Sequence, residues 1–124
     1  MVRVLLVEDD ADLAGVVIEA LEQDGHQAVH VCAPSEACAL AVSDVWDVFV
    51  VDAFGEHLAP DDDYRATLRR LATYGSVVVT TGRAWGTRAE ARDLGADALL
   101  TKPYDLTDLA DTLSALPARP GRQA

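Results

Sequence analysis

Residues 4–10 read VLLVEDD, four apolar residues followed directly by the carboxylates of Glu8, Asp9 and Asp10. The apolar run is long enough for a buried strand. Two like charges about 4 Å apart repel by roughly 4 kcal/mol at the effective dielectric of a protein surface. The stretch therefore leaves two alternatives: the acids spread into water, or they gather around a positive group.

Four further apolar runs of similar length follow along the chain. Each is rich in Val, Leu or Ala and lacks alternation of polar and apolar residues, which is typical of parallel strands covered on both faces. The predicted strands cover residues 2–7, 28–32, 48–51, 77–80 and 98–100.

Helical patterns follow each of these strands. Asp12 and Ser35 are predicted to cap the first two helices, and Gly25, Gly75 and Gly95 stop the first, third and fourth. The predicted helices cover residues 12–24, 35–43, 61–74, 87–94 and 106–116. The inward face of the third helix carries Tyr64, Leu68 and Leu71.

Repeated strand–helix units imply right-handed crossovers and a three-layer α/β domain, with a parallel sheet between two layers of helices. The 124 residues are enough for one such domain, which we expect to cover residues 1–116. The stretch PARPGRQA at 117–124 is rich in Pro and Gly, and it is predicted to be a flexible tail or the beginning of a linker.

The charge balance argues against several classes of function. The chain has 21 acidic and 10 basic residues and a formal net charge of −11, whereas direct nucleic-acid binding needs cations facing the phosphates. No apolar run approaches the roughly 20 residues of a membrane span, and the stretch MVRVLLVEDD does not read as a signal peptide. We therefore expect a cytoplasmic protein that contacts neither nucleic acid nor membrane directly.

The cysteines and histidines do not form a metal-binding pattern. Cys32 and Cys38 belong to no CxxC pair, and His26, His30 and His57 are scattered. Both cysteines are predicted to be small buried apolar residues.

Polar residues gather where the predicted strands end. In open α/β sheets, ligands bind outside the carboxyl ends of the strands. Acids follow the first and third strands, hydroxyls end the fourth, and a lysine followed by a proline comes after the fifth. The set comprises Glu8, Asp9, Asp52, Thr80, Thr81, Lys102 and Pro103. One acidic strand end is common as a cap or a solvated loop, but the whole set at one edge indicates a functional site.

Four segments together resemble the receiver domain of two-component response regulators: VLLVEDD at 4–10, VFVVDAF at 48–54, VVVTTG at 77–82 and GADALLTKPY at 95–104. The resemblance covers nearly the whole chain. It implies a flavodoxin-like, doubly wound fold with a five-stranded parallel sheet in the order 2-1-3-4-5 and five helices.

The resemblance also implies roles for the residues at the strand ends. Asp52 matches the phosphoacceptor, and Glu8 and Asp9 match the acids that, with Asp52, hold Mg²⁺ or alternatively Mn²⁺. The backbone carbonyl of Phe54 would complete the protein ligands. Such oxygen ligands suit a hard cation that keeps several waters. Asp10 is expected to lie outside the ligand set.

The remaining implied roles concern phosphoryl transfer. Lys102 would contact one phosphoryl oxygen as a compact point charge, and Thr80 would hydrogen-bond another. Transfer of this kind needs positioning and charge neutralisation more than covalent chemistry. Pro103 matches a cis-proline that aims the lysine into the site.

The implied function is a phosphorylation-controlled switch rather than an enzyme acting on other molecules, although the domain catalyses its own phosphorylation and dephosphorylation. A histidine kinase or a histidine phosphotransfer protein would supply the phosphoryl group, and a downstream effector domain or protein would read the result. The chain could act alone or as the receiver part of a longer protein, and monomer and dimer both remain open.

The sequence departs from the family at three places. Leu99 stands where many receivers carry the Tyr or Phe that moves together with the threonine, here Thr80, so this switch position lacks a large ring. The segment 53–64 differs from the usual short turn and contains Glu56 and His57. Thr81 adds bulk where relatives carry Ala or Gly, so phosphorylation is expected to be slower or more selective.

Three alternatives remain at this point. A haloacid-dehalogenase-type phosphatase would need a second Asp two residues after Asp52, where Phe54 stands. A flavodoxin-like FMN binder would need a Ser-, Thr- or Gly-rich phosphate loop where the acids at 8–10 lie. A pseudo-receiver would fold and bind partners without phosphorylation, and Leu99 and the unusual segment 53–64 favour it.

Overall fold

The computed structural model describes residues 2–52, 62–81, 95–102 and 104–116. Over these residues it contains five strands and four helices. The strands are β1 (Arg3–Val7), β2 (Gln27–Val31), β3 (Val48–Asp52), β4 (Ser76–Thr81) and β5 (Ala98–Thr101). The helices are α1 (Ala11–Gln23), α2 (Pro34–Ser43), α3 (Asp62–Ala72) and α5 (Leu106–Ala115). The helix predicted over 87–94 and the tail at 117–124 lie outside the described residues.

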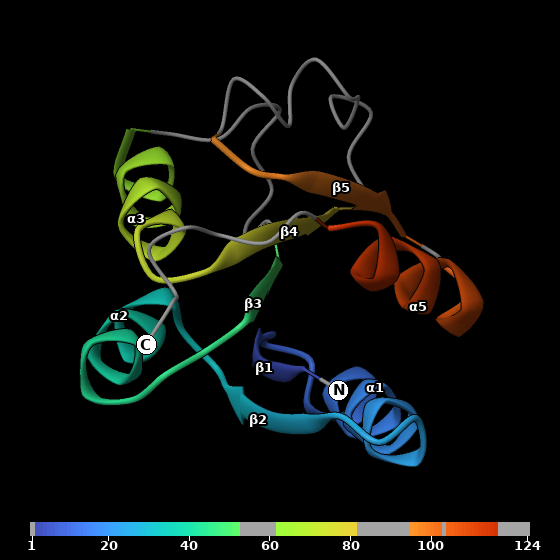
Figure 1. Cartoon of the computed structure of the whole chain (residues 1–124). Helices are drawn as coiled ribbons and strands as arrows, with labels where there is room; N and C mark the ends of the chain where they lie inside the picture. Colours follow the sequence, from blue (N-terminus) through green and yellow to red (C-terminus); the bar gives the residue numbers. More distant parts are fainter. Residues whose placement is uncertain (1, 53–61, 82–94, 103, 117–124) are drawn as a thin grey trace.

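The five strands form one parallel sheet in the order β2-β1-β3-β4-β5. Figure 1 shows α1 and α5 on one face of this sheet and α2 and α3 on the other. The prediction of a three-layer, flavodoxin-like fold with strand order 2-1-3-4-5 is therefore confirmed. All five predicted strands are present, with ends that differ from the predicted ones by one residue or none.

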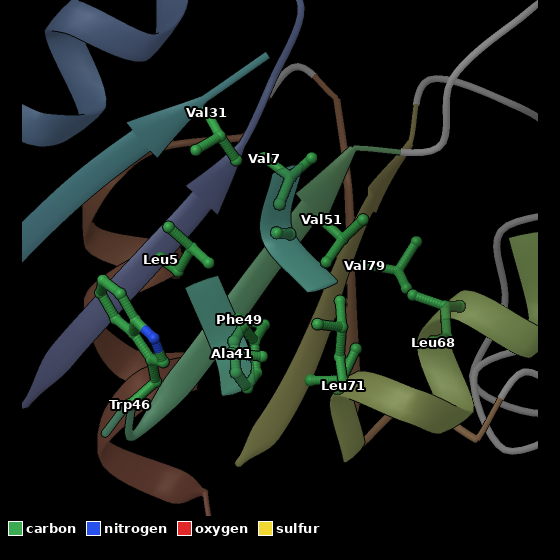
Figure 2. Close-up of a cluster of buried hydrophobic side chains, with 12 residues drawn as sticks. Leu5, Val7, Val31, Ala41, Trp46, Phe49, Val51, Leu68, Leu71 and Val79 are labelled. Carbon is green, nitrogen blue, oxygen red and sulfur yellow. The ribbon is translucent and has the colours of Figure 1, made fainter. Parts of the chain in front are cut away.

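Alternate residues of each strand point to opposite faces of the sheet, as the strand period of two requires. In β1, Leu5 and Val7 join the core under α2 and α3, whereas Val4 and Leu6 join the core under α1 and α5. Figure 2 shows the first of these cores. Both faces are apolar, and this explains why the strand sequences lack polar alternation.

Trp46 is buried in the first core. Its indole Nε1 donates to the carbonyl of Leu40 at 2.9 Å, and the guanidinium of Arg3 lies 4.3 Å from its ring centroid. The polar edge of the ring is thereby satisfied inside an apolar cluster.

Two predicted helix caps are wrong. Asp10, not Asp12, caps α1: its carboxylate accepts from the backbone N–H groups of Asp12 and Leu13, both at 3.1 Å. Helix α2 begins one residue earlier than predicted, at Pro34, so Ser35 lies inside the helix and is not its cap. Proline is favoured in the first turn because its φ is already helical and it lacks an N–H group that would need a partner there.

The prediction that both cysteines are buried is also wrong. Cys32 is exposed just beyond the end of β2, an edge strand, and Cys38 is half-buried against the first core. The edge strand has a neighbour on one side only, so residues at its end are less covered than those of β1 or β3. None of the helices in the described part of the chain is long and apolar enough to cross a membrane.

Candidate functional site: an acidic cluster at the carboxyl edge of the sheet

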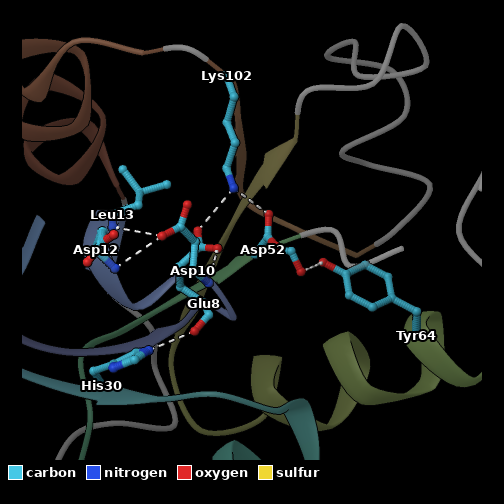
Figure 3. A network of polar contacts seen from close by, with 8 residues as sticks. All are labelled: Glu8, Asp10, Asp12, Leu13, His30, Asp52, Tyr64 and Lys102. Carbon is cyan, nitrogen blue, oxygen red and sulfur yellow. Dashed lines mark hydrogen bonds and ion pairs between the residues drawn. The ribbon is translucent and has the colours of Figure 1, made fainter. Parts of the chain in front are cut away.

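The carboxyl ends of three strands meet around one lysine. Glu8 directly follows β1, Asp52 ends β3, and Lys102 directly follows β5. The Lys102 Nζ lies 3.0 Å from Glu8 Oε1 and 2.7 Å from Asp52 Oδ1 (Figure 3). The sequence prediction that these residues share one edge of the sheet is borne out, although 50 positions separate Asp52 from Lys102 and 94 separate Glu8 from it.

Both carboxylates that contact Lys102 are buried. Glu8 is 2% exposed and Asp52 is 8% exposed, whereas the Lys102 side chain is 25% exposed. Buried charges are costly unless they are paired and hydrogen-bonded. Lys102 pairs with both acids at once, and this double contact offsets the cost of burying them together.

The protonation equilibria reflect this burial. Burial raises the pKa of Glu8, and it also raises the pKa of Asp52, because both carboxylates lose hydration; the bonds from Lys102 only partly oppose this. The carboxylate of Asp9 pushes the pKa of Asp52 up further. Burial alone would lower the pKa of Lys102, but its bonds to Asp52 and Glu8 outweigh that effect and raise it. The site has more negative charge than one lysine balances.

A third acid joins the two buried ones. Asp9 is exposed, and one carboxylate oxygen from each of Glu8, Asp9 and Asp52 can be chosen so that all lie within 4.8 Å of one another. Three carboxylates and one ammonium carry a formal charge of −2. Hard oxygen ligands at this density, with one exposed member open to water, fit a divalent cation such as Mg²⁺.

Asp10 has a structural role beside this cluster. Its carboxylate caps α1, and its backbone N–H donates to Glu8 Oε2 at 3.2 Å. It is not part of the group of acids whose oxygens converge. This geometry agrees with the expectation that Asp10 is not one of the metal ligands.

The strand β4 brings two hydroxyl residues to the same edge. Thr80 is opposite Asp52 in the register of β3 and β4, and it is 1% exposed. Thr81 is equally buried, and its carbonyl accepts from the Lys102 backbone N–H at 2.6 Å. Thr81 thus fixes the backbone that carries the lysine, and Thr80 lies beside the predicted acceptor.

The other predicted site residues fall into two groups. Leu99 pairs with Val79 in the register of β4 and β5 and packs, half-buried, against the first core. Phe54, Pro103 and the departures at Glu56 and His57 lie outside the described residues, so the predicted backbone ligand and the predicted cis-proline stay predictions.

Two contacts at the site were not predicted. The Tyr64 hydroxyl donates to the backbone carbonyl of Asp52 at 3.0 Å, and His30 Nε2 lies 2.7 Å from the backbone carbonyl of Glu8 (Figure 3). A carbonyl oxygen only accepts, so the imidazole must carry its proton on Nε2. Helical spacing placed Tyr64 on the inward face, and this was the one sequence signal for either contact.

The fold and this cluster together define a class: a CheY-like α/β domain with an acidic site at the carboxyl edge of its sheet. No protein-family model matches the sequence. The chain is 34% identical over 121 residues to the transcriptional regulatory protein TcrA of Mycobacterium tuberculosis, covering 95% of this chain and 47% of TcrA. The chain spans about half the length of the curated relatives it matches.

Solved structures agree on the fold. The chemotaxis protein CheY4 of Vibrio cholerae superposes with a TM-score of 0.76 at 21% identity, over 94% of this chain and 99% of CheY4. The receiver domain of the sensor histidine kinase PA1611 of Pseudomonas aeruginosa, solved with a magnesium ion in its active site cleft, gives 0.74 at 20% identity, over 93% and 96% of the two chains. The regulator relatives and the CheY-like fold together support the prediction from the motifs, a receiver domain of the kind found in two-component response regulators.

Proposed function

We propose that this receiver domain accepts a phosphoryl group on Asp52 in a Mg²⁺-dependent reaction and thereby switches its contacts with other proteins. The observation that carries the proposal is the convergence of Glu8, Asp9 and Asp52 with Lys102 at one edge of the sheet. Two of these acids are buried with raised pKa values. Such a charge imbalance is characteristic of functional sites more than of structural ion pairs.

Asp52 is the nucleophile in this proposal. One of its carboxylate oxygens forms a bond to phosphorus while the bond from phosphorus to the donor's imidazole nitrogen breaks. Lys102 already holds Asp52 Oδ1 at 2.7 Å, so its ammonium needs only a small movement to contact a phosphoryl oxygen on the modified residue. Thr80, opposite Asp52 on β4, would donate its hydroxyl to another phosphoryl oxygen.

The metal would be held by Glu8, Asp9 and Asp52, with the Phe54 carbonyl as the predicted further ligand. Bound Mg²⁺ neutralises negative charge on the transferring group, and Mn²⁺ has a similar ligand preference. The magnesium ion in the PA1611 receiver domain supports the same ion here. Pro103, the next residue in the sequence, is proposed to aim Lys102 into the site.

The partners follow from this chemistry. The donor would be a histidine kinase or a histidine phosphotransfer protein, and an effector domain or protein would read the phosphorylated state. TcrA is a transcriptional regulatory protein more than twice as long as the matched region, so a regulatory output beyond the receiver is one proposed arrangement. Any contact with DNA would then belong to the output and not to this acidic domain.

The direct test is incubation of the chain with acetyl phosphate and Mg²⁺, followed by intact-mass measurement. We expect a single phosphate adduct that disappears when the metal is chelated and is absent in Asp52→Asn. Asp10→Asn is the matched control, because it removes a neighbouring charge but retains a good helix cap, and it should still be phosphorylated. An adduct that persists in Asp52→Asn, or none in the unmodified chain, would contradict the proposal.

The second candidate function is a pseudo-receiver that binds partners without phosphorylation. The specific observation in its favour is Leu99, which packs into the core where many receivers carry a mobile aromatic ring. The same mass measurement separates the two candidates, since only the first takes up phosphate at Asp52.

A further inference from the structure

The backbone of the proposed phosphoacceptor is tied to the helical layer by a tyrosine. Asp52 is the last residue of β3, and its main-chain carbonyl accepts from the hydroxyl of Tyr64, in the first turn of α3, at 3.0 Å. Figure 3 shows this bond on the side of Asp52 opposite Lys102. Asp52 is thus held at two points, its carboxylate by the lysine and its main chain by the tyrosine.

These two bonds differ in what the proposed reaction does to them. The contact from Lys102 to Asp52 Oδ1 is made to the reacting carboxylate, and the ammonium would have to shift as a phosphoryl group arrives. The bond from Tyr64 is made to a main-chain atom that takes no part in the reaction. The bond from Tyr64 can therefore persist while the carboxylate attacks, and it fixes the main chain from which the Asp52 side chain extends.

Tyr64 is held in place by packing around its ring and its helix. Its ring packs against the first core, and the same helix is anchored by Leu68 and Leu71, both fully buried. A rigid donor on a packed helix is the arrangement that holds a reacting group in place.

We propose that Tyr64 is a positioning residue for Asp52, fixing its main chain so that the carboxylate points at the incoming phosphoryl group. This inference rests on the proposed function, because it assigns Tyr64 to the same reaction. The hydroxyl of Tyr64 bonds the main-chain carbonyl of Asp52, and Tyr64 acts on the reaction through that carbonyl. It also links the phosphoacceptor directly to α3, without passing through Thr80 or Leu99.

The test compares Tyr64→Phe with Tyr74→Phe. Each removes one phenolic hydroxyl, but Tyr74 is an exposed residue just beyond the same helix and lies outside the site. Phosphorylation by acetyl phosphate at saturating Mg²⁺ is followed by intact mass at several donor concentrations. We expect kcat to fall about fivefold to tenfold in Tyr64→Phe, as for loss of one hydrogen bond that aligns the transition state, with KM for the donor changed by less than about twofold.

Thermal unfolding of both variants separates positioning from simple stability. If Tyr64 matters only to folding, Tyr64→Phe will melt at a lower temperature but react at the wild-type rate wherever it is folded, and the inference is then wrong. If Tyr64→Phe does not fold, Tyr64→His takes its place, because its shorter side chain cannot place a donor where the phenolic hydroxyl lies, and its rate should fall below that of the wild type. A wild-type rate in Tyr64→His would overturn the inference, because the shorter side chain cannot reproduce the same bond.

The outcomes also separate this inference from the function on which it rests. No adduct in the unmodified chain refutes the proposed phosphorylation, and the role of Tyr64 is refuted with it. Phosphorylation of the wild type, Tyr64→Phe and Tyr74→Phe at equal rates refutes the role of Tyr64 alone. A loss in Tyr64→Phe with none in Tyr74→Phe supports both.

Discussion

The positive charge of Lys102 compensates negative charge at the site, because its single ammonium group contacts two buried carboxylates. A third acid, Asp9, stands at the exposed side of the same cluster. The repulsion between neighbouring acids at the end of β1 is therefore relieved in part by a residue from the end of β5. The remaining excess of negative charge is what a divalent cation would neutralise.

The raised pKa values predict how stability depends on pH when no metal is bound. A buried acid whose pKa is higher in the folded state binds more protons when folded, so stability falls as pH rises from the ordinary carboxyl pKa of about 4 through the raised value. Asp52→Asn removes one such group. In urea unfolding with a chelator present, the wild type should therefore lose stability more steeply than Asp52→Asn over this window. Parallel curves would show that burial of Asp52 carries no such penalty.

Glu8 and Asp10 are predicted to differ sharply despite their proximity. Glu8→Gln removes a buried acid of the converging cluster and should abolish most of the Mg²⁺ affinity measured by calorimetry. Asp10→Ala removes the cap of α1 and should cost about 1 kcal/mol of unfolding free energy while leaving Mg²⁺ affinity nearly unchanged. A large loss of affinity in Asp10→Ala with none in Glu8→Gln would reverse this assignment.

At the level of elements, the turn from α3 into β4 is packed closely against the turn before β3. A Cβ atom at Gly75 would lie 3.0 Å from the Asp47 carbonyl oxygen and 3.1 Å from a ring carbon of Phe49. A Cβ atom at Gly15, in α1, would meet no atom within 4 Å apart from its chain neighbours and the adjacent backbone of its own helix. The two glycines therefore provide a matched pair for testing the packing.

Gly75→Ala is predicted to destabilise the domain by about 1–3 kcal/mol, because backbone atoms and a core ring would have to shift. Gly15→Ala is predicted to stabilise it by about 0.5–1 kcal/mol, since alanine has the higher helix propensity and no clash occurs. Urea unfolding of both variants checks these signs. Equal effects of the two substitutions would mean that the turn at Gly75 is not tightly packed.

The strands were predictable because burial on both faces leaves a continuous apolar run, as in VLLV at 4–7 and VVV at 77–79. The helix caps were harder to predict, because several acids and a serine stand near the helix starts and could each act as a cap. Only local geometry selects Asp10 over Asp12. The exposure of Cys32 does not follow from its residue type or from its own strand sequence, since it depends on β2 being an edge strand. Strand order came from the family resemblance and not from the strand sequences themselves.

The charged part of the site was predictable because parallel strands bring their carboxyl ends to one edge. Glu8, Asp52 and Lys102 each stand directly at such an end. The neutral contacts were not predictable: Tyr64 and His30 donate to main-chain carbonyls, and a backbone acceptor leaves no trace in the sequence. These contacts appear only once α3 packs on the sheet and β2 pairs with β1.

For the molecule as a whole, the sheet order explains where the site lies. β1 and β3 are neighbours although β2 separates them in sequence, and the helices after β1 and β3 cover opposite faces of the sheet. Such a switch in strand order opens a crevice at the carboxyl edge. The net charge of −11 adds repulsion across the whole domain to the local repulsion between the acids of the site. A bound cation should therefore stabilise the whole fold.

Mg²⁺ is accordingly predicted to raise the melting temperature. Binding to the folded state alone contributes about 2.7 kcal/mol at a metal concentration one hundred times Kd, which corresponds to several degrees for a domain of this size. Calorimetry in Mg²⁺ and in NaCl of equal ionic strength separates binding from screening. The rise should be lost in Glu8→Gln, and an equal rise in that variant would indicate screening only.

The central claim is that phosphate is carried by the side chain of Asp52 as an acyl phosphate. The most direct measurement treats the chain with acetyl phosphate and Mg²⁺, reduces it with borohydride and maps its peptides by mass spectrometry. Reduction of an aspartyl phosphate leaves homoserine, so we predict homoserine at position 52 and an unchanged Asp at positions 9 and 10. Homoserine at another position, or a phosphate that survives borohydride on a hydroxyl residue, would contradict the account.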